Sequence, residues 1–269
     1  MSELVTFGGR SYDVYDISQR LSNATSEHEP MPHVVEYTDH LAAAPQTEAK
    51  YGIRAKWWPN GEAWAYERVT LTTHSGTHID APYHYTPKTA AGKEPLRIDE
   101  IPFQWVMSDG FLLEMMDVDR RLGITADDVR RELDRIGYQP KENDICLVRT
   151  DTSRHYEEPG YDQLHAGLRK GATRWLVEHG VRLIGIDAWG VDRPLGIMVE
   201  EAAAGDTAQL WESHKYGAEG PYSQIEKLDN LDLLPRNHGF QVMALPISIE
   251  AASGAWARVV ALFEAGEAD

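Results

Sequence analysis

The segment from His74 to His84 constrains this chain more than any other. It reads His-Ser-Gly-Thr-His-Ile-Asp-Ala-Pro-Tyr-His, so three histidines and one aspartate lie within a short stretch. Imidazole is a ligand for zinc, manganese and iron, and a carboxylate adds affinity for a hard divalent cation. Gly76, Pro82 and the neighbouring threonines disfavour a helix, so the segment is predicted to be a strand that leads into a loop.

Extended backbone would place all four candidate ligands together. Side chains of a strand alternate between its two faces, so every second position shares a face. One face then carries His74, His78, Asp80 and His84, and the missing side chain of Gly76 leaves room for an ion. The alternative is a polar strand edge with solvated histidines. A single histidine would favour that interpretation, whereas four candidate ligands on one face favour a metal site.

The same segment resembles the signature of the cyclase-like metal-dependent hydrolases. This family includes bacterial kynurenine formamidase, isatin hydrolase, trans-dienelactone hydrolase and some aromatic polyketide cyclases. Its pattern is H-x-G-T-H-x-D-x-P-x-H, and residues 74–84 match every fixed position. The resemblance extends over residues 16–263 and is more specific at 74–84 than at 181–192 and 214–231. It implies a swivelling β/β/α domain, expected here as a single domain over residues 1–269.

The resemblance also implies further site residues. In two-metal members of the family a histidine and a later glutamate complete the shell of the second ion, and His214 and Glu226 look like that pair. Gln224 is an alternative ligand or a substrate contact if only one ion is bound. Asp187 is the first aspartate of the motif Gly-Ile-Asp-x-x-x-x-Asp, which resembles a turn beside the family's site. Asp187 could orient a metal-bound histidine or cap its own turn, and both alternatives remain open.

The predicted cofactor is a divalent ion, Zn or Mn, with one or two per chain, because nitrogen and oxygen ligands suit both metals. Such an ion lowers the pKa of water and polarises a carbonyl group. His74, His78 and Asp80 are the expected fixed ligands. His84 is set apart by Pro82, and its family counterpart is the general acid/base, a role that suits an imidazole pKa near 6.5.

The reaction that the resemblance implies is hydrolysis of a cyclic amide, a lactone or an N-formyl arylamine. One alternative is a polyketide-type cyclase, in which the same ion and His84 promote an intramolecular aldol condensation. Another is a metal-binding or ligand-binding protein without catalysis, which would not require His84. Ser-His-Asp catalysis is disfavoured because the chain has no G-x-S-x-G motif.

Residues 51–66 contain Trp57, Trp58 and Trp64 around Pro-Asn-Gly. This stretch is either a hairpin packed on the core, or an aromatic wall for a flat substrate or an oligomer contact. Trp64 is therefore kept as a candidate substrate-binding residue. The resemblance implies homodimers or homotetramers with exchanged N-terminal segments, so residues 1–50 are a candidate exchange arm.

Composition limits which classes of partner the protein can bind and which cellular compartment it fits. The formal net charge of -17 argues against nucleic acid and anionic membranes, which require a basic surface. The single cysteine, Cys146, excludes an intramolecular disulfide, fits a reducing cytoplasm and lies in an apolar run, so it is expected to be buried. The N-terminus lacks a signal peptide pattern, and no apolar run is long enough to span a bilayer.

Hydrophobic patterns predict a mixed α/β fold, in which a mixed sheet is flanked by a few helices. Two helices are expected, at 125–135 with Thr125 as N-cap and at 164–179, and each precedes a strand. A further helical region is expected at 195–213. Strands are expected at 11–22, 34–38, 110–115, 144–150, 181–187, 239–247 and 257–263.

Overall fold

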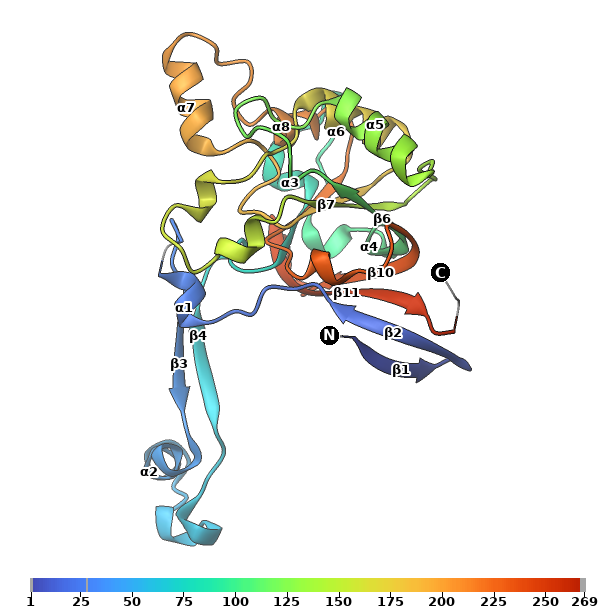
Figure 1. Cartoon of the computed structure of the whole chain (residues 1–269). Coiled ribbons are helices and arrows are strands. Elements are labelled where there is room, and N and C mark those ends of the chain that lie inside the picture. The colour runs from blue at the N-terminus through green and yellow to red at the C-terminus, as the bar shows by residue number, and fades with distance from the viewer. Residues whose placement is uncertain (1, 28, 267–269) are drawn as a thin grey trace.

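The computed structural model describes residues 2–27 and 29–266, as a body built on one mixed sheet and an arm that projects from it (Figure 1). The strands are β1 (Glu3–Phe7), β2 (Arg10–Asp16), β3 (Val34–Thr38), β4 (Tyr66–Thr70), β5 (His78–Asp80), β6 (Met107–Glu114), β7 (Ile145–Arg149), β8 (Leu183–Ile186), β9 (Ser223–Glu226), β10 (His238–Pro246) and β11 (Gly254–Glu264). The α-helices are α1 (Asn23–Ser26), α2 (His40–Tyr51), α3 (Pro82–Tyr85), α4 (Phe103–Val106), α5 (Ala126–Ile136), α6 (Lys170–Glu178), α7 (Leu195–Ala203) and α8 (Glu212–Tyr216).

The main sheet closes on itself. Its order is β1-β2-β11-β10-β6-β7-β8-β9-β5, and β5 also pairs with β11, which completes a ring from β11 round to β5. Strands β6 to β9 are parallel, and helices connect them; the other pairs are antiparallel. The short strand β5 therefore lies between β9 and β11, where His78 is opposite Glu226 on one side and Trp256 on the other.

The buried strands pack against two hydrophobic cores, because successive side chains of a strand point to opposite faces of the sheet. In β7, Ile145 and Leu147 pack in the cluster inside the ring, whereas Cys146 and Val148 pack in the cluster beneath α5 and α6. Both faces of the strand are apolar for this reason. Cys146 is fully buried, as the sequence predicted, and burial raises the pKa of its thiol.

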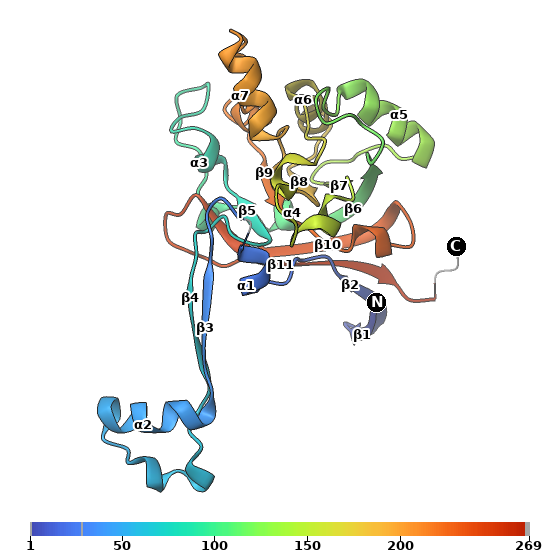
Figure 2. The same ribbon diagram turned by 60° about the vertical axis from the view of Figure 1, so that its left-hand side comes forward.

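The arm is a separate two-stranded hairpin. Strands β3 and β4 pair only with each other, and α2 with two 3₁₀ turns, at Ala55–Trp57 and Pro59–Gly61, forms its far end (Figures 1 and 2). Its own core is a small cluster of three buried alanines, on which Trp58 packs. The aromatic stretch is therefore not packed on the main core: the side chains of Trp57 and Trp64 are 61% and 43% exposed.

The predicted mixed α/β class, with a mixed sheet flanked by helices, is confirmed. The helix expected at 164–179 begins only at Lys170, because Leu168 forms a β-bridge with Ile124 and Gly167 packs against the backbone of Asp192. The region 195–213 is split into α7 and α8. Within the described ranges, no helix has the length and apolar character needed to cross a membrane.

The N-terminal region contributes to both the body and the projecting element. Residues 3–16 form β1 and β2 at the edge of the main sheet, and the one-turn helix α1 follows them. The projecting element spans residues 34–70, so the expected range of 1–50 overlaps it only in part.

Candidate metal centre

The local backbone of the histidine segment differs from continuous extended chain. His78 and Asp80 alternate on β5, as predicted. His74 lies in a turn that Gly76 makes possible, because this residue has a φ of +59°. A Cβ at Gly76 would come 3.1 Å from Leu21, so the glycine serves the turn and not a space for an ion. His84 lies on α3, four residues after Asp80 at the end of β5.

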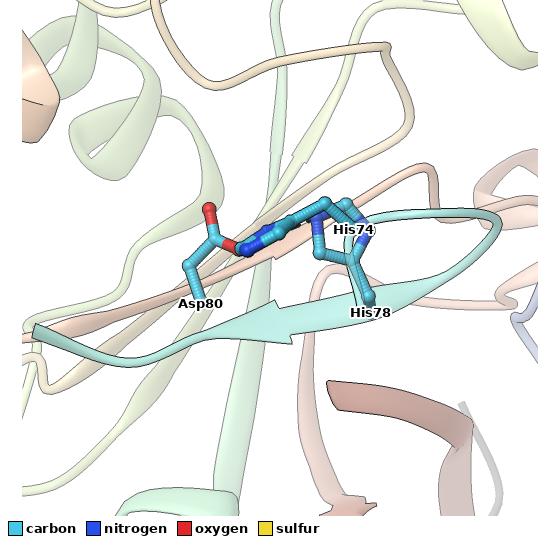
Figure 3. Close-up of side chains that lie close together, drawn as sticks. All are labelled: His74, His78 and Asp80. Atoms are coloured by element: carbon cyan, nitrogen blue, oxygen red, sulfur yellow. Dashed lines mark hydrogen bonds and ion pairs between the residues drawn. The ribbon is translucent and has the colours of Figure 1, made fainter. Parts of the chain in front are cut away.

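His74, His78 and Asp80 nevertheless converge (Figure 3). The Nδ1 atom of His74 is 2.6 Å from Oδ1 of Asp80, and Nε2 of His78 is 3.3 Å from the same oxygen. The His78 Nδ1–H donates to the carbonyl of Gly76 over 2.8 Å, which leaves Nε2 free to bind a cation. The turn at Gly76 therefore also fixes the histidine tautomer.

A second group of potential ligands shares Asp80. Asp80, His84 and His214 bring their ligand atoms within 4.8 Å of one another. Glu226 lies between the two groups, with Oε2 3.6 Å from Nε2 of His78 and Oε1 3.6 Å from Nε2 of His214. The structure thus brings together all six residues that the sequence assigned to metal binding or proton transfer, from β5, α3, α8, β9 and the turn before β5.

The donor set fits a divalent cation. Nε2 of His78 and Oδ2 of Asp80 are buried and have no hydrogen-bond partner within the part of the chain that the structure describes. Buried polar atoms without partners are costly, and a cation would supply the missing interaction. Gly254 on β11 leaves the space that His74 and Asp80 occupy. A Cβ at this position would come 2.8 Å from the ring of His74 and 3.3 Å from Oδ1 of Asp80.

Burial and mutual charge shift the pKa values of these groups in opposite directions. Burial lowers the pKa of His84 to about 4, despite the nearby Asp80 carboxylate. Burial also opposes the charge on His214, but its hydrogen bond to Asp192 and the nearby Asp80 carboxylate raise the pKa of His214 to about 10. Burial and the charge of Asp80 raise the pKa of Glu226. Because metal ligands bind in their deprotonated forms, a cation at this site would compete with protons for these groups.

Three comparisons with known proteins bear on this geometry. The family model described as "Putative cyclase" matches residues 15–193, about two thirds of the chain. The chain belongs to this cyclase family. The prediction of a hydrolase of this family is confirmed, and its cluster of histidines and aspartate suits a divalent metal.

Curated relatives and solved structures cover most of this cyclase-family chain. Kynurenine formamidase of Bacillus thuringiensis (strain Al Hakam) is 26% identical over 218 residues, which are 76% of this chain and 89% of the relative. Isatin hydrolase A from Ralstonia solanacearum has the same fold, with a TM-score of 0.72 and 24% identity over 94% of this chain and 92% of that one. A predicted metal-dependent hydrolase from Bacillus stearothermophilus has a TM-score of 0.60 and 22% identity over 93% and 98%.

Asp187 and Asp192 of the family-like turn have different contacts. Asp187 accepts hydrogen bonds from the backbone N–H groups of Thr150 and Asp151, so its carboxylate caps the loop after β7 and not its own turn. Asp192 contacts the site instead: its Oδ2 accepts from Nδ1 of His214 over 2.5 Å. Asp192 was not predicted from the sequence as a site residue, although its place as the last aspartate of the turn motif could have identified it.

The other two predicted residues differ in their position: Gln224 lies opposite Asp80 in the β5–β9 pair, whereas Trp64 belongs to the arm. Gln224 is fully buried on β9, two residues before Glu226, and its amide nitrogen donates to the hydroxyl of Tyr222. Trp64 packs edge-to-face on Trp58 and Tyr51. These contacts place it with α2 and the 3₁₀ turns at the end of the arm, which projects away from the body (Figure 2).

The metal centre opens into a cavity of about 420 Å³. Its walls are largely apolar, and the ring of Trp211 stacks on His214 with centroids 4.1 Å apart and also contacts His84 edge-on. Sequence analysis missed this tryptophan because an isolated aromatic residue carries no pattern. The wall residues are Met31, Trp189, Leu195, Met198, Leu210 and Trp211.

Proposed function

We propose that this protein hydrolyses a cyclic amide, a lactone or an N-formyl arylamine, with one or two Zn or Mn ions per chain. The single observation that carries the proposal is the arrangement around Asp80. This carboxylate belongs to two groups of ligand atoms, and Glu226 is adjacent to a histidine of each. A shared carboxylate between two sets of ligands favours two ions over one, with His74 and His78 in the first set and His214 and Glu226 in the second.

The metal, when bound, would activate water and polarise the carbonyl of the substrate. Within the chain, Asp192 orients His214 through a 2.5 Å hydrogen bond, and the carbonyl of Gly76 orients His78. His84 is the proposed general acid/base. Its lowered pKa of about 4 leaves the imidazole neutral at pH 7, so that it can take a proton from water and give it to the leaving nitrogen or oxygen.

The cavity walls favour a flat, apolar substrate. Trp189 and Trp211 line the space in front of the metal ligands, together with aliphatic side chains and methionines. Aromatic surfaces of this kind bind rings through stacking and edge contacts. The names of the relatives support the same class, since kynurenine formamidase and isatin hydrolase act on compounds with an aromatic ring.

We also propose that the protein is a homodimer or homotetramer that associates through the arm of residues 34–70. The arm exposes Tyr37, Tyr51, Trp57 and Trp64, a set of aromatic side chains that its own small core cannot cover. Docking on a second copy would bury them and would bring Trp64 to another subunit. The single buried cysteine supports a cytoplasmic location for this assembly.

The test uses metal-loaded protein, with an aromatic cyclic amide, an aromatic lactone and an N-formyl arylamine as substrates. His84→Ala should lower turnover of the accepted substrate by about 10² to 10⁴-fold, because proton transfer is lost. Its metal content, measured by mass spectrometry, should equal that of the unchanged protein. His179→Ala is the matched control, because His179 lies outside the site on Trp175 and its loss should leave turnover unchanged. Failure to hydrolyse any of the three substrates would refute the proposal.

A further inference from the structure

A buried lysine directly follows the metal-site glutamate. Lys227 is 3% exposed and has a left-handed backbone with a φ of +59°, a conformation that side chains other than Gly, Asn and Asp adopt infrequently. Its ammonium group lies 3.4 Å from the carbonyl of His74 and 2.9 Å from the carboxylate of Glu29. A buried ammonium group requires a negative partner, so the lysine is stable here only with an anion beside it.

Two further donors point to the same carboxylate. The hydroxyl of Tyr161 donates to Oε1 of Glu29 over 2.6 Å, and the indole N–H of Trp189 donates to Oε2 over 3.0 Å. Tyr161 and Lys227 are buried. Trp189, which lies in the loop after β8, is partly buried. Three donors from three parts of the body thus surround the two oxygens of one carboxylate, which is the chemistry of an anion site.

The donors and the acceptor differ in how they are held. Lys227 is fixed in the body, because its N–H donates to the carbonyl of Ala188 and its own carbonyl accepts from the hydroxyl of Thr77. Glu29 belongs to the N-terminal segment before β3. This segment has hydrogen bonds that do not involve the Glu29 side chain, such as the one from the N–H of His33 to Oγ of Ser26. The backbone of Lys227 would therefore keep its position if the Glu29 side chain withdrew.

The Glu29 carboxylate lies beside the candidate metal centre. Glu29 and Lys227 line the same cavity as His74, His84 and Glu226, in front of its apolar walls. An aromatic molecule in the cavity would thus have its ring against those walls and a carboxylate within reach of Lys227. The site suits a ligand with both features, and the Glu29 carboxylate occupies the position that the ligand carboxylate would take.

We propose that Tyr161, Trp189 and Lys227 form a carboxylate subsite beside the metal centre, for which an aromatic carboxylate competes with Glu29. The ligand class rests on the proposed function. When water adds to the carbonyl carbon of an aromatic cyclic amide and the ring C–N bond breaks, the products are a carboxylate and an amine, with one proton released where that amine is an arylamine. A lactone gives a carboxylate, a hydroxyl and a released proton. In both cases the new carboxylate stays on the aromatic product, whereas an N-formyl arylamine releases it as formate, so the subsite favours ring-opening substrates.

Calorimetric titration of benzoate into metal-loaded protein tests the subsite. Removal of the competing carboxylate in Glu29→Ala should tighten benzoate binding by about tenfold or more. The double variant Glu29→Ala/Lys227→Met should lose this gain, because the ammonium group is absent. Glu27→Ala is the matched control, since Glu27 is an exposed carboxylate of the same segment and its removal should not change the affinity.

Several outcomes would overturn the subsite. Equal benzoate affinity in Glu29→Ala and the unchanged protein would do so, and so would a gain that persists after Lys227→Met, which would assign benzoate to the metal. If Glu29→Ala does not fold, Glu29→Gln keeps the side-chain volume without the charge and should give the same gain. The readout is independent of turnover: tighter binding without hydrolysis of any substrate would refute the proposed function alone, whereas hydrolysis without tighter binding would refute the subsite alone.

Discussion

At the metal centre charged side chains are buried, whereas in the arm of residues 34–70 aromatic side chains are exposed. Asp80 and His78 are 0% and 1% exposed, while Trp57 and Tyr37 are 61% and 69% exposed. Both arrangements are unfavourable for an isolated chain in water, because buried polar atoms lack partners and exposed rings remain hydrated. This difference supports the proposals made above for each region: a cation at the centre, and an apolar surface of a second copy against the arm.

Loss of the shared carboxylate should have the largest effect. Asp80→Asn removes the charge that both groups of ligands share, and we expect turnover to fall by about 10³-fold or more, since a metal centre supplies several kcal/mol of transition-state stabilisation. Metal content should fall in parallel. Asp99→Asn, an exposed substitution outside the site, is the control. Full metal content with Asp80→Asn would show that Asp80 is not a ligand.

The cavity histidine His165 should make stability depend on pH. Burial lowers its pKa to about 4, below the unfolded value near 6.5, so the unfolded chain takes up a proton first as the pH falls. This group stabilises the fold above pH 6.5, and the contribution is lost between pH 6.5 and 4. It should account for about 2 kcal/mol of the stability lost between pH 7.5 and 5.

His165→Gln isolates that contribution, because glutamine can still donate to the carbonyl of Asp192, as Nε2 of His165 does. Urea unfolding of the metal-free proteins at the two pH values gives the comparison, in which all other titrating groups are shared. The variant should lose less stability on acidification than the unchanged protein. Equal losses would mean that His165 is not held neutral in the fold.

Two buried aspartates of one turn form a matched pair for the orientation of His214. Asp192→Asn removes the charged acceptor of Nδ1, and we expect metal affinity to fall by about 10 to 100-fold. Asp187→Asn alters an equally buried carboxylate that bonds Thr150 and Asp151 instead, so metal affinity should stay within about twofold. Competition with a chromophoric chelator measures both. The reverse order of effects would restore Asp187 as the residue that orients the ligand.

The arm should give the smallest single-residue effect. Trp57→Ser removes one exposed ring from the proposed interface and should weaken self-association by about tenfold, the usual size for one aromatic contact. Sedimentation analysis across a concentration series measures the change. Phe103→Ser, on the body, removes a side chain that is 76% exposed and serves as the control. If only the control weakens association, the interface lies on the body and not on the arm.

The same two regions show how far sequence alone reaches. The spacing of His78 and Asp80 predicted a shared face correctly, and Thr125 as N-cap predicted the start of α5, because both signals are local. The joining of the two groups of ligands depends on β5 lying between β9 and β11, a pairing that periodicity cannot show. Asp192 was not distinguished from Asp187 because tertiary contacts alone separate them. The aromatic side chains of the arm resemble core residues in sequence, and only the fold shows that they are exposed.

The most direct test of the account is the metal content of the purified protein and of His214→Ala, measured by mass spectrometry after reloading with Zn or Mn. The account predicts about two ions per chain in the unchanged protein and about one in the variant, because His214 belongs to the second group of ligands only. About one ion in both proteins would contradict the two-ion centre and leave His214 free for substrate. No ion in the unchanged protein would contradict the metal-dependent mechanism itself.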